Sequence, residues 1–200
     1  MLYSILQFLF PKLLIRKPQS EFCLYITFDD GPTPEVTEWV LKTLKTANIE
    51  ATFFCLGKQI EAFPEIFEDI KNFGHSIGNH GYDHLNGWKT DKKTYLQNIE
   101  IGYQKTNSRL FRPPYGRINP LWIPRVLENH KLVFWSILSQ DFNTNINPEL
   151  TIQKILKKLK NGDIVVFHDS EKAFENLKIL LPAVIEWGEK RSVVWGKLYY

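Results

Sequence analysis

Short runs of β-branched and aromatic residues alternate with longer amphipathic segments along almost the whole chain after residue 20. The predicted strands cover residues 22–28, 51–56, 76–79, 110–112, 132–136 and 163–167. Because strands that alternate with helices form parallel β/α units, the chain is expected to be an α/β protein. Roughly six or seven such units fit either a closed barrel or an open doubly wound sheet.

The segments between these strands carry helix start signals. Thr33 precedes Pro34 and is expected to cap a helix, and the pairs Asn119–Pro120 and Asn147–Pro148 repeat this pattern. Pro64 is expected to open another helix, which Gly74 ends. The apolar positions at helical spacing include Val36, Val40, Leu44, Phe67, Ile70, Leu96, Ile99, Tyr103, Ile152, Ile155, Leu177, Leu181 and Ile185.

The N-terminal residues 1–19 form a separate apolar segment ahead of the predicted domain at 20–200. The apolar run of residues 1–15 is shorter than the about 20 residues that a membrane span needs, and it lacks the flanks of a signal peptide. Leu2, Ile5, Leu6 and Leu9 share one helical face, which predicts a short helix packed on the domain. The alternative is a membrane-surface anchor through residues 1–17.

Length, charge and cysteine content exclude several classes of protein. A chain of 200 residues favours one domain, and 25 basic against 22 acidic residues argue against a nucleic-acid partner. No glycine-rich phosphate-binding motif is present in the sequence. The two cysteines, Cys23 and Cys55, rule out a disulfide scaffold, and we expect buried thiols because their strands place them at different heights.

Two groups of candidate metal ligands follow predicted strands. The adjacent carboxylates Asp29 and Asp30 end the first strand, and such neighbours raise each other's pKa unless a cation lies between them. His80 and His84 follow the third strand and can converge on one ion. Two histidines and a carboxylate are typical of a hydrolytic Zn²⁺ site or a non-haem Fe²⁺ site. His75 is expected to be structural or to support the ligands.

Three further side chains are expected at the same edge of the sheet. Arg112 can reach a carboxylate there with two hydrogen bonds, although a surface arginine is the more common case when the residue is taken in isolation. His168 follows a buried strand, and Asp141 could orient it as an aspartate orients a catalytic histidine.

Five segments in this order resemble the polysaccharide deacetylase family, also described as the NodB-homology domain or carbohydrate esterase family 4. They are TFDDGP at 27–32, HGYDH at 80–84, RPPYG at 112–116, SQDF at 139–142 and IVVFHDS at 164–170. The resemblance covers about residues 20–185 and implies a distorted (β/α)7 barrel as a single catalytic domain.

The resemblance also implies roles for individual residues. Asp29 corresponds to the catalytic base that activates a metal-bound water, and His168 corresponds to the general acid. The metal ligands are Asp30, His80 and His84. The supporting catalytic residues are Arg112, which pairs with the base, Asp141, which orients the acid, and Tyr115, whose backbone N–H binds the oxyanion. The expected substrate-binding residues are Trp88, Pro114, Tyr115, Phe142 and Val166, the last as a wall of the acetyl pocket.

Three positions depart from the family pattern. Gly81 replaces a hydroxyl residue that would brace the metal loop, Leu138 stands where an acidic residue is common, and Phe142 stands where tryptophan is usual. None of the three is an expected ligand, base or acid. The departures therefore concern substrate fit more than catalysis.

The implied function is metal-dependent removal of N-acetyl groups from a GlcNAc-containing polysaccharide, either peptidoglycan or a chitin-like polymer, with release of acetate. Zn²⁺ is the expected ion, and Co²⁺ or Ni²⁺ would also suit the ligand set. The alternatives are O-deacetylation of acetylated xylan and a catalytically silent sugar-binding protein. We expect a monomer. The sequence itself leaves the compartment open, and the resemblance implies the cell envelope or the exterior.

Overall fold

The computed structural model describes residue 10 and residues 13–200. In this part of the chain, parallel strands form one curled sheet in the order β5–β4–β3–β2–β1–β7–β6, with β8 also paired to β1. The strands are β1 (Cys23–Asp29), β2 (Thr52–Cys55), β3 (Ser76–Asn79), β4 (Leu110–Phe111), β5 (Lys131–Leu132), β6 (Ile137–Leu138), β7 (Asp163–His168) and β8 (Val194–Gly196). The prediction of a single-domain α/β fold with a distorted barrel is confirmed.

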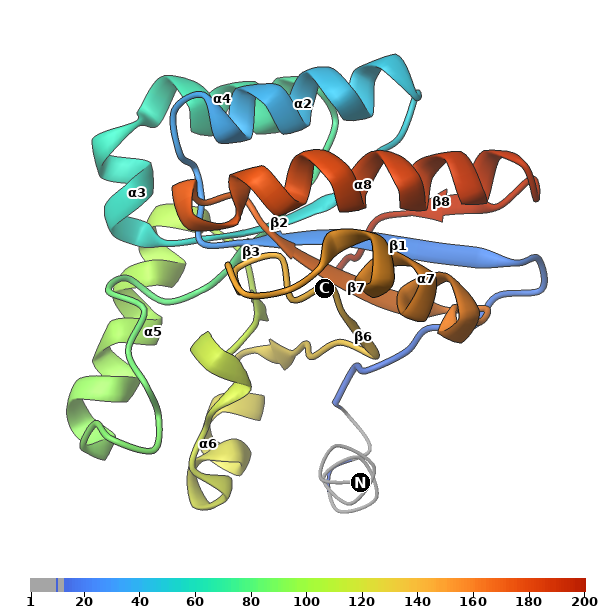
Figure 1. Ribbon diagram of the computed structural model, residues 1–200. Coiled ribbons are helices and arrows are strands. Elements are labelled where there is room, and N and C mark those ends of the chain that lie inside the picture. The colour runs from blue at the N-terminus through green and yellow to red at the C-terminus, as the bar shows by residue number, and fades with distance from the viewer. Residues whose placement is uncertain (1–9, 11–12) are drawn as a thin grey trace.

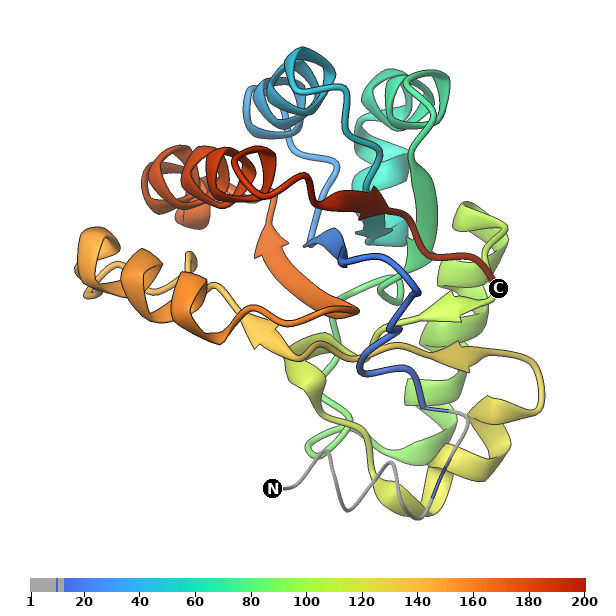
Figure 2. The ribbon, with the colours of Figure 1, turned by 90° about the vertical axis from the view of Figure 1, so that its right-hand side faces the viewer.

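Helices cover the outside of the curved sheet (Figures 1 and 2). Figure 1 shows α2, α4 and α8 on one side of the strands and α5 and α6 toward the other. The α-helices are α2 (Val36–Thr46), α3 (Gly57–Ala62), α4 (Pro64–Asn72), α5 (Lys92–Thr106), α6 (Ile123–Leu127), α7 (Pro148–Lys158) and α8 (Phe174–Glu189). Short 3-10 turns are η1 (Pro114–Gly116), η2 (Pro120–Trp122) and η3 (Glu171–Ala173).

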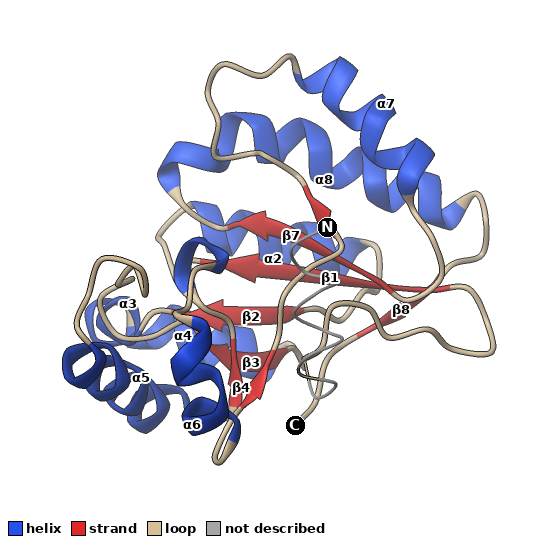
Figure 3. Cartoon of the chain, turned by 90° about the horizontal axis from the view of Figure 1, so that it is seen from below, coloured by secondary structure: helices blue, strands red, loops and turns tan. Residues whose placement is uncertain are grey.

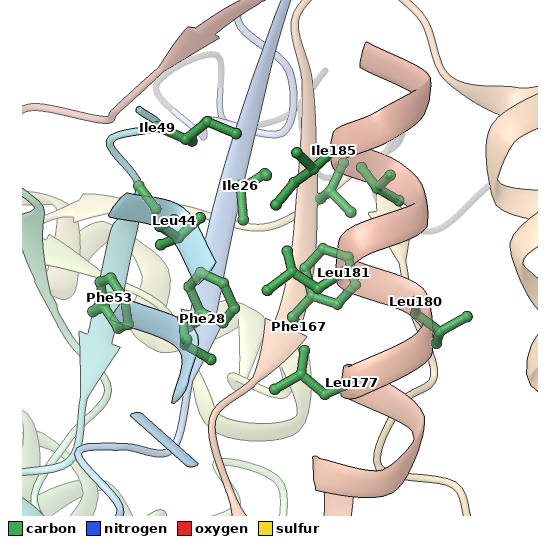
Figure 4. Close-up of a cluster of buried hydrophobic side chains, with 14 of the residues drawn as sticks. Ile26, Phe28, Leu44, Ile49, Phe53, Phe167, Leu177, Leu180, Leu181 and Ile185 are labelled. Atoms are coloured by element: carbon green, nitrogen blue, oxygen red, sulfur yellow. The ribbon is translucent and has the colours of Figure 1, made fainter. Parts of the chain in front are cut away.

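The largest apolar core lies between strands β1, β2 and β7 and helices α2, α4 and α8. Figure 4 shows Leu177, Leu181 and Ile185 directed from α8 toward the sheet, where Phe28 and Phe167 lie. The rings of Phe28 and Phe167 are 6.0 Å apart at their centroids. This packing fixes β1 and β7 side by side, and each of these strands carries site residues at its end.

The predicted helix starts hold at two of the three cap-and-proline pairs. The Asn119 side chain accepts a hydrogen bond from Leu121 N–H, and that of Asn147 accepts one from Leu150 N–H. The prediction for Thr33 is wrong because α2 begins at Val36 after Glu35, which forms a capping box with Glu38. Thr33 instead belongs to the turn that leaves β1.

The strand predicted at 132–136 is also wrong, because residues 133–136 lie between the separate strands β5 and β6. Between them the Ser136 hydroxyl donates to Asp163 Oδ1 and accepts from Ile164 N–H, so a side chain adds to the backbone bond from Ser136 N–H to Ile164 O. Helix α3 and strand β8 were not predicted. With six and three residues respectively, both are too short to show a clear periodicity.

Residues 13–17 pack on the domain as an extended segment. Leu14 N–H donates to Leu132 O, and Lys17 N–H donates to Gly162 O. Leu13 and Ile15 are buried, and Arg16 forms an ion pair with Asp163 at 2.6 Å. The helix predicted from Leu2, Ile5, Leu6 and Leu9 lies outside the described residues. None of the helices in the described part of the chain combines the length and apolar character that crossing a bilayer requires.

The two cysteines are buried and unbridged, as expected. The register of β1 against β2 pairs Thr27 with Thr52, which sets Cys23 and Cys55 at different heights in the sheet.

Candidate active site

The C-terminal ends of the central strands meet at one edge of the sheet, as the parallel arrowheads of β7, β1 and β2 in Figure 3 show. A pocket of about 470 Å³ opens there. Its walls come from loops that follow β1, β3, β4, β6 and β7. The lining residues are Asp29, Asp30, His80, His84, Tyr115, Arg117, Trp135, Leu138, Phe142, His168, Ser170 and Lys172. The metal-ligand and acid–base candidates from distant parts of the sequence therefore share one cavity.

Asp29 is held by a buried arginine. Arg112 is fully buried, and its Nη1 donates to Asp29 Oδ1 at 2.6 Å and to the hydroxyl oxygen of Thr27 at 2.8 Å. Its other terminal nitrogen donates to Phe134 O, and the guanidinium lies 4.0 Å from the centroid of the Phe54 ring. This charge-assisted bond ties Asp29 to a buried cation and fixes the direction of its second oxygen. The alternative that Arg112 is a surface arginine is therefore wrong.

Asp30, His80 and His84 converge on one point. Asp30 Oδ1 lies 3.7 Å from His80 Nε2 and 3.2 Å from His84 Nε2. One ligand atom from each residue can be chosen so that all three lie within 4.8 Å of one another. Asp30 Oδ1 is buried without a hydrogen-bond donor among the described residues. Burial alone would raise the pKa of Asp30, but the nearby His84 and the charge of His168 hold it below its usual value.

The protonation of His80 shows that this cluster suits a cation. Its Nδ1 lies 2.8 Å from Arg112 O, and because a carbonyl only accepts, Nδ1 carries the proton. Burial lowers the pKa of His80 to about 4, so Nε2 presents a lone pair at neutral pH. That lone pair faces a carboxylate oxygen of Asp30, and two facing acceptors are unfavourable unless a positive ion lies between them. The donor set fits Zn²⁺ and other divalent transition metals.

Three site residues have left-handed backbone conformations. The φ angles are 87° at Asp30, 59° at His84 and 59° at Tyr115. For residues other than glycine, such conformations cost of order 1–3 kcal/mol each and concentrate at functional sites. The Tyr115 ring lies 4.4 Å from that of His84, measured between centroids. The strain therefore falls on two of the candidate ligands and on the residue that lies over one of them.

His168 is paired with a fully buried carboxylate. Its Nδ1 lies 2.7 Å from Asp141 Oδ1, and its backbone N–H donates to Asp141 Oδ2 at 2.7 Å. Burial alone would lower the pKa of His168, but the negative charge of Asp141 and its hydrogen bond raise it to about 9. The Phe142 ring stands edge-on to the imidazole at 4.9 Å between centroids. A cationic imidazole with Nε2 available in the pocket can serve as a proton donor.

The expected substrate-binding residues are not all brought to the cavity. Tyr115 and Phe142 line it, together with Leu138 and Trp135. Val166 and Pro114 are buried beneath the surface, and Leu138, which pairs with Val166 in the sheet, is the side chain that reaches the pocket. Trp88 is exposed beside the cavity, where Arg117 lies over its ring.

The loop that carries the two histidines is braced by asparagines that the sequence reasoning missed. The Asn79 side chain accepts from Gly81 N–H at 2.7 Å, and the Asn98 side chain accepts from Tyr82 N–H at 2.9 Å. Gly81 has φ of 81°, and a Cβ atom there would lie 2.7 Å from Asn98 Oδ1. Glycine therefore fits a loop that is braced by amides rather than by the expected hydroxyl group.

Asp169 was missed as well, although it directly follows His168 in the IVVFHDS segment. Its buried carboxyl accepts from Gly31 N–H at 3.0 Å and from the Thr37 hydroxyl at 2.7 Å. A Cβ atom on Gly31 would lie 2.0 Å from Asp169 Oδ2, so only glycine permits this approach. Asp169 thus ties the turn after Asp30 to helix α2.

His75, by contrast, precedes β3 at the opposite edge of the sheet, and its Nδ1 accepts from Ala51 N–H.

The comparisons with known proteins agree with this geometry. The family model for polysaccharide deacetylase matches residues 16–132. This chain belongs to the polysaccharide deacetylase family. A peptidoglycan-N-acetylglucosamine deacetylase of Bacillus cereus is 36% identical over 160 residues, which cover 76% of this chain and 75% of that relative. A chitooligosaccharide deacetylase of Azorhizobium caulinodans is 32% identical over 175 residues and covers 77% of each chain.

A solved structure shows the same fold at higher coverage. It is a crystal structure of a peptidoglycan N-acetylglucosamine deacetylase in complex with 4-naphthalen-1-yl-N-oxidanyl-benzamide, with a TM-score of 0.80 and 28% identity. The superposition covers 94% of this chain and 91% of the other. The likeness therefore extends beyond residue 132, where the family match ends.

Proposed function

We propose that this polysaccharide deacetylase hydrolyses the N-acetyl groups of a GlcNAc-containing glycan with a divalent metal held by Asp30, His80 and His84. The observation that carries the proposal is the meeting of three kinds of group in one pocket. These are the Asp29 carboxyl group paired with Arg112, three convergent ligand atoms, and an imidazole kept protonated by Asp141. A site with each of these roles filled supports hydrolysis rather than sugar binding alone.

Asp29 acts as the general base in this proposal. Arg112 occupies Oδ1, and Oδ2 lies 4.0 Å from His80 Nε2, beside the three ligand atoms. A water held between this oxygen and the ligands would give its proton to Asp29 as it attacks the acetyl carbonyl. When bound, a Zn²⁺, Co²⁺ or Ni²⁺ ion lowers the pKa of a coordinated water and polarises the carbonyl.

His168 acts as the general acid. Its pKa of about 9 keeps the imidazole protonated at neutral pH, and Asp141 occupies Nδ1, so Nε2 carries the proton that can be given away. The departing sugar nitrogen receives this proton, which yields a free amine and acetate. The backbone N–H of Tyr115, in its left-handed turn, is the proposed donor to the developing negative oxygen.

The relatives named above act on peptidoglycan and on chitooligosaccharides, and both contain N-acetylglucosamine. This supports an N-acetyl substrate over acetylated xylan. Hydrolysis of an acetyl ester in xylan would need the same base, ligands and acid. The N-acetyl and O-acetyl substrates must therefore be compared by assay.

The test uses the purified chain, stripped of metal by a chelator and reloaded with Zn²⁺ or Co²⁺. Acetate release is measured from chitopentaose, peptidoglycan and acetylated xylan side by side. We expect release from the N-acetylated substrates only with metal, and slower release from xylan. Absence of acetate from every substrate, with bound metal confirmed by elemental analysis, would overturn the proposal.

A further inference from the structure

We infer that the active-site pocket selects a glycan that carries a carboxylate close to the acetylated sugar, and that Arg117 and Lys172 bind this carboxylate. The inference rests on the proposed deacetylase function and narrows its substrate class. It starts from the pocket lining, which includes both of these cationic side chains. They come from different parts of the fold, because Arg117 follows η1 and Lys172 lies in η3.

Arg117 is held in place before any substrate arrives. Its guanidinium lies 5.0 Å over the Trp88 ring, and the Trp88 indole N–H donates to Ile118 O at 3.3 Å. The backbone of Arg117 is fixed too, because its N–H donates to Pro114 O at 3.0 Å. Trp88, which the sequence suggested as a sugar-stacking residue, thus supports a cation that lines the pocket.

The charges around Arg117 and Lys172 leave these cations available for a ligand. In the stretch 13–200, neither side chain lies within 4.0 Å of a carboxylate oxygen, whereas Arg112 and Arg16 are both paired. The carboxylates in the pocket lining are Asp29, which is paired with Arg112, and Asp30, which lies with His80 and His84 at the proposed metal site. The remaining walls carry apolar Leu138 and Phe142, which add no negative charge.

A planar guanidinium binds a carboxylate with two parallel hydrogen bonds, and an ammonium in the same pocket adds charge without fixing direction. A neutral polymer such as chitin gives these cations no partner. A lactyl ether or uronic acid group on a neighbouring sugar would give them one. The pocket chemistry therefore favours an acidic glycan over a neutral one.

The experiment compares substrates that differ only in this charge. GlcNAc–N-acetylmuramic acid oligosaccharides are used with the lactyl carboxylate free or converted to its N-methylamide, with chitotetraose as a neutral reference. The Zn²⁺-loaded protein is assayed for acetate release at low and at high salt. We expect kcat/KM to be about ten-fold higher for the free acid at low salt, chiefly through KM, and the preference to shrink at high salt.

Arg117→Gln is expected to reduce the preference for the free acid to within about two-fold, and Lys172→Gln to reduce it by a smaller factor. Arg109→Gln is the matched control, because Arg109 also lies over an aromatic ring, that of Tyr103, but outside the pocket. The Arg109→Gln variant should leave the preference unchanged.

Equal kcat/KM for the acid and the amide would overturn the inference while the deacetylase function stands. A preference that survives Arg117→Gln and Lys172→Gln together would overturn the assignment of these residues. No acetate from any substrate would overturn both the function and the inference.

Discussion

Asp141 binds His168 at two points, since one carboxylate oxygen meets the ring Nδ1 and the other accepts the backbone N–H, each at 2.7 Å. The first contact sets the charge of the imidazole, and the second sets its position. Because Asp141 is fully buried, the pair is shielded from water, and its electrostatic effect is larger than that of a surface pair.

This pairing predicts an alkaline limit to activity. With the pKa of His168 raised to about 9, kcat/KM should fall as the pH rises through about 9, because the acid then lacks its proton. Asp141→Asn removes the negative charge with little change of shape, and the limit should move down by about two pH units. The measurement is kcat/KM from pH 6 to 10, and an unchanged limit in the variant would contradict the assignment of the acid.

The same pKa predicts how stability depends on pH. Because the folded pKa of His168 lies above the unfolded value of about 6.5, the pair stabilises the fold fully below pH 6.5. This contribution is lost as the pH rises from about 6.5 through 9. Urea denaturation across this range should show a decline in the free energy of unfolding that is much smaller in Asp141→Asn, where the carboxylate that raises the pKa is absent.

Removing the base should separate turnover from metal binding. Asp29→Asn is expected to lower kcat by at least about 100-fold, the usual contribution of a general base. Zn²⁺ affinity, measured by calorimetry, should stay within a few-fold because the three ligands remain. A variant that keeps more than a tenth of the activity would contradict the role of Asp29. Since Arg112 loses its counter-charge, some loss of thermal stability is expected, and assays belong well below the melting temperature.

Most of the architecture followed from the sequence because it depends on local patterns. Strand residues 76–79 and the helix starts at Asn147 and Pro64 were predicted where they occur, since caps, prolines and β-rich runs act over a few residues. The helix cap predicted at Thr33 is wrong because the turn after β1 is shaped by contacts with Asp169, which is distant in sequence. The strand predicted at 132–136 is wrong because this segment contains Ser136, whose side chain forms hydrogen bonds with Asp163 and Ile164 across the sheet.

The candidate site was predictable where its residues belong to a sequence motif. It was not predictable where tertiary contacts determine which residues take part. Asp29 and His168 end strands β1 and β7, Asp30 and His80 follow strands directly, and His84 lies in the loop after β3, so parallel strands bring all five residues to one edge. The bracing by Asn98 was not visible, because a helix residue reaches the metal loop only after folding. Trp88 and Val166 are not among the residues that line the pocket, because position near a motif does not fix where a side chain lies, and their roles in substrate binding stay predictions.

A pair of histidine variants should distinguish the metal site from the core. His84→Ala removes a partly exposed candidate ligand and is expected to weaken Zn²⁺ binding by at least about 100-fold, with little change in the stability of the metal-free protein. His75→Gln is the matched control. Its ring packs on Phe53 at 5.1 Å, so the variant should lose about 1–3 kcal/mol of stability and keep its metal affinity. Equal metal affinity in His84→Ala and the unmodified protein would contradict the ligand set.

Asp169 should be replaceable by asparagine but not by alanine. Burial raises the pKa of its carboxyl to about 8, so the group is largely uncharged at neutral pH. An asparagine side chain would keep an oxygen for Gly31 N–H and offer its amide N–H to the Thr37 hydroxyl oxygen, so Asp169→Asn should cost less than about 1 kcal/mol. Asp169→Ala leaves Gly31 N–H unpaired and opens a cavity, and it should cost about 2–4 kcal/mol. Because Gly31 follows Asp30, the alanine variant should also bind Zn²⁺ more weakly by about ten-fold. Urea denaturation and calorimetry test both effects, and an alanine variant with the stability and metal affinity of the unmodified protein would show that this contact does not position the turn.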